Sequence, residues 1–162
     1  MKLAENMKIV PILASEDTGA GVSMDSINMK DFHHATFLIT FATLVGDAVL
    51  TVNSGATAGA LTSALTFNYA LGGADIGTAV AGSTSSADVL AADTAAATLT
   101  LTAATYSDRL LVIEVDASAM DVANGEEWLT VALSSAGTSG FVHCVAVLEP
   151  RYSGSRSVTC LA

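Results

Sequence analysis

Strict alternation of apolar and polar residues is the dominant pattern in this chain. Residues 35–41, ATFLITF, put three large apolar side chains on one face and threonines on the other. The same period of two occurs in four further segments, at residues 47–53, 60–69, 97–102 and 127–134. Alternation of this kind is typical of β-strands that are buried on one face only. The pattern therefore predicts several half-buried strands.

Two other segments are apolar on both faces. They are RLLVIEV at residues 109–115 and FVHCVAVL at residues 141–148. Strands that are covered on two sides have this composition. We therefore expect both segments in the middle of a sheet, with the second face against another subunit, a loop or a helix.

Turn-forming residues separate these strands, and one segment has the composition of a helical turn. Residues 116–125, DASAMDVANG, offer Asp116 or Ser118 as a cap and Asn124 with Gly125 as the end. Many short strands at this spacing favour an antiparallel sandwich or barrel. We predict one all-β domain over residues 1–162, an antiparallel β-sandwich or barrel that is jelly-roll-like, with one short helical turn. Its extended termini would be an N-terminal arm, residues 1–6, and a C-terminal arm, residues 151–162.

Composition and charge change this picture by restricting the partners. The chain is 51% hydrophobic but only 14% charged, so small residues must cover much of its surface, as in proteins that pack against others. The formal net charge is −10, and no Lys or Arg lies between Lys30 and Arg109. Nucleic acid is therefore not an expected partner, because phosphate binding needs clustered cations. The cations near both ends either dock on an acidic neighbour or are there by chance.

Neither export, a membrane span nor a disulfide framework is expected. The first ten residues, MKLAENMKIV, contain polar residues where a signal peptide needs an apolar stretch. The uncharged stretch between Asp47 and Asp75 alternates with a period of two, which is unlike a membrane helix. Cys144 lies in an apolar run and is expected to be a small buried side chain, and a bond to Cys160 is not favoured.

The sequence shows no catalytic motif, so we expect no enzyme activity, no catalytic residues, no cofactor and no metal. His33 and His34 are adjacent in a strand and so face opposite sides, and His143 is interpreted as a core histidine. Acidic residues gather around the helical turn, where a solvated loop is favoured over a calcium site. Trp128 is either a carbohydrate platform or, as we prefer, a residue packed under a loop or in a subunit contact. The acidic residues of that loop are Glu114, Asp116, Asp121, Glu126 and Glu127.

Four segments resemble a known family of virion proteins. They are ENMKIVPIL at 5–13, MKDFHHATFLITF at 29–41, LLVIEVDASAMDVANGEEWLTVALSS at 110–135 and FVHCVAVLEPRY at 141–152. Together they are similar to small head decoration, or cement, proteins of tailed bacteriophages. The resemblance implies a β-rich, trimeric protein on the outside of the capsid, where it bridges capsid subunits after expansion. It would be made in the host cytoplasm, with the major capsid protein and further copies of itself as partners, and no nucleic acid or membrane.

Many weak contacts, repeated around a symmetric oligomer, would supply the binding energy. Extended arms suit this role because an arm can add a strand to the open edge of a neighbour. Other hypotheses are a tail or fibre accessory protein and a carbohydrate-binding sandwich module. The candidate interaction residues are Lys2, Leu3, Lys8, Trp128, Arg151, Tyr152 and Arg156.

Overall fold

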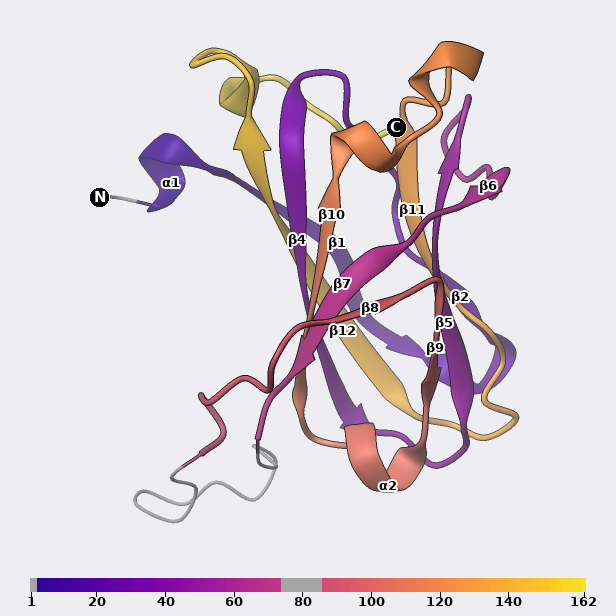
Figure 1. The fold of residues 1–162 in the computed structure, drawn as a ribbon. Coiled ribbons are helices and arrows are strands. Elements are labelled where there is room, and N and C mark those ends of the chain that lie inside the picture. The colour runs from indigo at the N-terminus through magenta and orange to yellow at the C-terminus, as the bar shows by residue number, and fades with distance from the viewer. Residues whose placement is uncertain (1–2, 74–85) are drawn as a thin grey trace.

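Two antiparallel sheets packed face to face form the protein (Figure 1). This computed structural model describes residues 3–73 and 86–162, with the side chain of Arg156 outside the description. The first sheet, sheet A, contains in spatial order β1 (Lys8–Asp17), β12 (Phe141–Pro150), β4 (Phe32–Thr43), β10 (Leu110–Asp116), β7 (Phe67–Leu71) and β8 (Thr94–Ala96).

The second sheet, sheet B, is built from shorter strands. Its spatial order is β2 (Val22–Ser23), β11 (Trp128–Leu133), β5 (Ala48–Gly55) and β6 (Ser63–Ala64), with β3 (Ile27–Asn28) also paired to β11 and β9 (Thr98–Leu101) to β5. The predicted all-β antiparallel sandwich is therefore confirmed.

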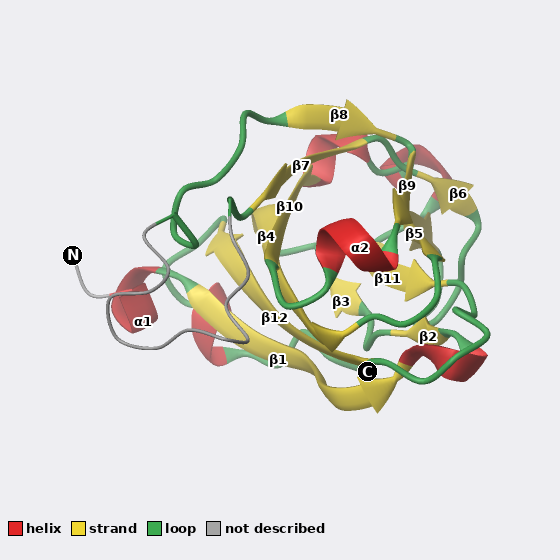
Figure 2. Ribbon diagram, turned by 90° about the horizontal axis from the view of Figure 1, so that it is seen from below, coloured by secondary structure: helices red, strands yellow, loops and turns green. Residues whose placement is uncertain are grey.

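The strand pairing has the order of a jelly roll, in which the first half of the chain pairs in reverse with the second half. Thus β1 pairs with β12, β2 and β3 with β11, β4 with β10, and β5 with β9. Pairing of β12 with β4 and of β11 with β5 joins these pairs into the two sheets. Strands β6 to β8 are inserted between β5 and β9. Seen end on, the strands form a nearly closed ring, with β8 and β9 on one side and β1 and β2 on the other (Figure 2).

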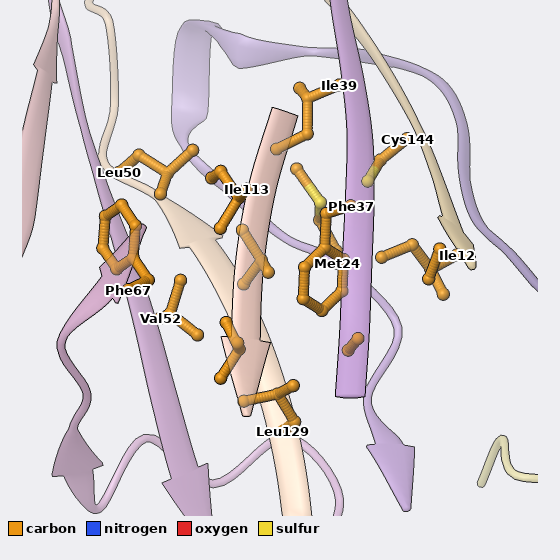
Figure 3. Packing of buried hydrophobic residues seen from close by; sticks show 14 of the residues in the cluster. Ile12, Met24, Phe37, Ile39, Leu50, Val52, Phe67, Ile113, Leu129 and Cys144 are labelled. Carbon is orange, nitrogen blue, oxygen red and sulfur yellow. The ribbon is translucent and has the colours of Figure 1, made fainter. Parts of the chain in front are cut away.

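The alternating residues fill the space between the sheets as predicted. Phe37, Ile39 and Phe41 of β4 are at most 1% exposed, and Leu50 and Val52 of β5 face them from sheet B (Figure 3). Each such side chain contributes about 1.5–3 kcal/mol when it is removed from water. Leu61, by contrast, belongs to the alternating segment 60–69 but is 48% exposed, because the chain becomes a strand only at β6, two residues later.

Helical structure among the described residues is limited to single turns. The predicted turn after β10 is confirmed as two consecutive 3-10 turns: Asp116 is the N-cap of the first, and the second ends at Gly125, whose φ of 76° is left-handed. No described helix is long and apolar enough to cross a bilayer. The turns are α1 (Leu3–Asn6), η1 (Thr18–Ala20), α2 (Ala103–Tyr106), η2 (Ala117–Ala119), η3 (Val122–Asn124) and η4 (Ser155–Ser157).

Strands β10 and β12 lie inside sheet A, as their apolar composition predicted. The second face of β12 is less covered than expected, since Val145 and Val147 are only partly buried. Strand β11 shows the reverse: its alternation predicted one exposed face, but Thr130 and Ala132 are both buried. On its outer side Thr130 contacts Ser26, and the two hydroxyl groups share a hydrogen bond of 2.7 Å.

Gly46 provides a test of the packing at the turn between β4 and β5. A Cβ at this position would overlap the backbone carbonyl oxygen of Ala136, which cannot rotate away. We expect Gly46→Ala to lower the free energy of unfolding by about 1–3 kcal/mol, measured by urea denaturation. Gly154→Ala is the matched control, because no atom lies near its Cβ and its φ of −84° suits alanine. Equal stability of the two variants would contradict this account.

Candidate interaction surfaces

Three of the candidate interaction residues, Leu3, Arg151 and Tyr152, lie in α1 or directly after β12. Leu3 on α1 is 47% exposed and Tyr152 after β12 is 67% exposed. A surface hollow of about 370 Å³ between α1 and the end of β12 is lined by Glu5, Asn6 and residues 150–153. Lys2 lies outside the described residues, as does the side chain of Arg156. The two termini therefore contribute to one region of the surface.

The residues after β12 fold back on the same chain. The backbone N–H of Arg151 donates to the carbonyl of Asp31 at 2.8 Å, and its Nε donates to the carbonyl of Phe32 at 2.9 Å. Further along, Lys8 Nζ donates to the carbonyl of Val158 at 2.7 Å. The carbonyl of Cys160 accepts from the backbone N–H of Asn28 at 2.8 Å.

These contacts correct the expectation that residues 151–162 form an arm that reaches outward. Cys160 is 4% exposed and belongs to the apolar core, with Leu161 packed against it. Burial of these side chains and the four hydrogen bonds hold the segment on the body. Lys8 and Arg151 serve here as donors to backbone carbonyls of the same chain. At the other end, residues 3–6 form the exposed turn α1, which buries no side chain.

Trp128 lies beside this C-terminal segment. It is partly buried and lines a hollow of about 230 Å³ together with Phe32, Cys160 and neighbouring residues. A carbohydrate platform needs an aromatic ring with one open face. Trp128 contributes to the wall of this hollow, next to the tail residues 158–161.

The outward side of sheet A carries an apolar surface, of which sequence reasoning located only the part on residues 141–148. In the register of the sheet, Pro11 lies opposite Val145, which lies opposite Leu38. The adjacent row places Ile9 opposite Val147. We call these five residues the outer apolar face. Only the cross-strand register reveals it, because the residues come from three distant segments.

The acidic loop after β10 is not uniformly solvated, contrary to expectation. Glu126 is 5% exposed, and its carboxylate accepts hydrogen bonds from the hydroxyls of Ser54 at 2.5 Å and Ser63 at 3.0 Å. Ser54 is fully buried and Ser63 is partly buried. Within residues 3–73 and 86–162, no group of three or more His, Cys, Asp or Glu residues could hold a metal. The cluster fixes the loop to sheet B.

The histidines are all on or near the surface. His33 is exposed and His34 is partly buried in β4, where His34 Nδ1 lies 3.2 Å from Asp116 Oδ1 and Nε2 lies 4.0 Å from Glu114 Oε2. His143 on β12 is exposed, so the interpretation as a core histidine is wrong. Its position between apolar residues reflects the uncovered outer side of sheet A.

Comparison with known proteins adds no family. No family model matches the chain, and none of the curated proteins compared matches it. Among solved structures, it is similar to one described as the structure of infectious bursal disease virus Gt strain, with 10% identity and a TM-score of 0.15. That likeness covers 94% of this chain and 43% of the viral chain, so the chain spans less than half of the neighbour's length. Such a low TM-score carries no argument.

The two cysteine thiols, which are free, allow detachment of the tail to be measured. Burial raises the pKa of Cys144 to about 12 and also raises the pKa of Cys160. Because the thiolate is the reactive form, both should resist a thiol reagent at pH 8 in the native protein. We expect Cys160 to react first, since local release of the tail exposes it, whereas Cys144 requires opening of the central strand β12.

The labelling rates can be followed by absorbance with a disulfide reagent. Cys160→Ser identifies the faster phase, and urea should make both thiols reactive. Labelling of the two thiols at one common rate would contradict a separately opening tail.

Proposed function

We propose that this chain is a structural virion protein that binds the outside of a phage capsid, as a trimer, and stabilises it by bridging capsid subunits. The observation that carries the proposal is the outer apolar face, which crosses three neighbouring strands. Ile9 and Pro11 are exposed there, and Leu38, Val145 and Val147 are partly exposed. Exposed apolar surfaces of this kind mark protein contacts. The resemblance of the strand segments to decoration proteins agrees with such a role.

The charge distribution favours this face for assembly. A chain with a net charge of −10 repels other acidic chains, so contact is favoured where no charge must be desolvated. The five residues of the outer apolar face carry none. The proposed partners are further copies of this chain and the major capsid protein, and the proposed role is not catalytic.

The jelly-roll order is compatible with this role, because the same topology serves in viral capsid domains and in lectins. Fold alone does not specify function. The proposal therefore depends on the exposed surface, and its test must address that surface.

Size-exclusion chromatography with light scattering and co-sedimentation with expanded capsids test the proposal. We expect a mass three times that of the chain, and binding to expanded shells of the major capsid protein from the same genome. Val145→Asp should dissociate the trimer and weaken capsid binding by about tenfold or more, since it places a charge in an apolar contact.

Val49→Asp is the matched control. Val49 is 38% exposed on β5 of the other sheet, so the same substitution there should leave both assembly and capsid binding unchanged. Circular dichroism establishes that both variants are folded. A monomeric wild type that ignores expanded capsids, or equal effects of the two variants, would overturn the proposal.

A further inference from the structure

The turn before β11 contains the one Asn–Gly dipeptide of the sequence. Asn124 is the last residue of η3, Gly125 follows it, and both are exposed to solvent. Asparagine is one of the chemically labile residues of proteins. When glycine follows it, no side chain shields the next backbone nitrogen, which can attack the asparagine amide. The dipeptide is therefore a candidate site of spontaneous covalent modification.

Asp121 holds the side chain of Asn124 in the folded turn. Asn124 Nδ2 donates to Asp121 Oδ2 at 2.6 Å, and the backbone N–H of Asn124 lies 3.3 Å from Asp121 Oδ1. Hydrogen bonds to a carboxylate are stronger than those between neutral groups. The amide of Asn124 is thus kept on Asp121, so it is not free to turn toward the following peptide bond.

The nitrogen that would attack is engaged as well. The backbone N–H of Gly125 donates to the carbonyl of Val122 at 3.0 Å, with Gly125 in the left-handed conformation at a φ of 76°. On either side, the N–H groups of Asn124 and Glu126 donate to the carbonyl of Asp121, both at 3.1 Å. Attack requires loss of the proton from the nitrogen, and the negative charge of Asp121 nearby disfavours the anion that results.

We propose that Asn124 is a latent deamidation site, which the folded turn keeps closed and which reacts when the turn opens. The nitrogen of Gly125 forms a bond to Cγ of Asn124, and the bond from Cγ to Nδ2 breaks. The proton displaced from Gly125 passes through solvent to Nδ2, which leaves as ammonia. One water molecule then opens the succinimide ring and gives aspartate or isoaspartate at position 124. The inference goes beyond capsid binding and does not depend on it.

The product cannot form the same turn again. Aspartate at position 124 places a carboxylate where Nδ2 donated to Asp121, so that two negative charges face each other in place of the hydrogen bond of 2.6 Å. Isoaspartate adds a methylene group to the backbone between amides that pair with Asp121 and Val122. A turn that has reacted therefore stays open, and the modification proceeds in one direction.

Peptide mapping by mass spectrometry tests the proposal on the unaltered protein. The protein is kept at mildly alkaline pH, folded in buffer or unfolded in urea, and conversion of Asn124 to aspartate and isoaspartate is followed with time. We expect conversion to be about tenfold or more slower in the folded protein, because the reaction there waits for local opening of the turn.

Asp121→Ala tests the restraint itself. We expect conversion of Asn124 in the folded variant to be about tenfold or more faster than in the folded wild type, since the variant loses hydrogen bonds to a charged group. Asp116→Ala is the matched control, because it removes the N-cap carboxylate of the preceding turn η2, which makes no side-chain cap hydrogen bond. Circular dichroism establishes that both variants are folded.

Asn124→Asp reproduces one product and tests the opening of the turn. Hydrogen exchange at the amides of residues 124–126 should be about tenfold or more faster than in the wild type, because the turn then opens locally. Asn28→Asp is the control for the added charge. Asn28 Oδ1 accepts from the backbone N–H of Lys30 at 3.0 Å, and a carboxylate can serve there equally well.

Each comparison can overturn the proposal. Conversion of Asn124 at the same rate in the folded and the unfolded chain would show that the turn gives no protection. An unchanged rate in folded Asp121→Ala would remove Asp121 from the restraint. Exchange at residues 124–126 that is no faster in Asn124→Asp than in Asn28→Asp would show that the product leaves the turn closed. The first comparison needs no substitution, so it decides even where Asp121→Ala fails to fold.

Discussion

Face-to-face packing of two apolar sheet surfaces is the constraint on which the rest of this structure depends. In the jelly-roll order, strand β12 lies between β1 and β4, so the last strand of the chain completes the central part of sheet A. Its inward residues Val142, Cys144, Ala146 and Leu148 are at most 1% exposed. The sheet cannot form until residues near both ends of the chain meet, as at Lys8 and Leu148, and such long-range pairing makes folding slow.

Alternation predicted this packing because it is a local property of each strand. A residue such as Phe37 or Leu129 faces the core whichever strands become its neighbours, provided that the sheet has two sides. Coverage of the outward side is different, because it depends on neighbouring strands and loops. The apolar Val145 is only partly covered, whereas the polar Thr130 is buried and shares a hydrogen bond with the hydroxyl of Ser26.

The same distinction explains why the candidate surfaces were only partly predictable. No periodic pattern in the sequence marks Cys160 as a core residue. It joins the core where the tail packs on the body and its carbonyl accepts a hydrogen bond from the backbone N–H of Asn28. The outer apolar face exists only in the register of β1, β12 and β4.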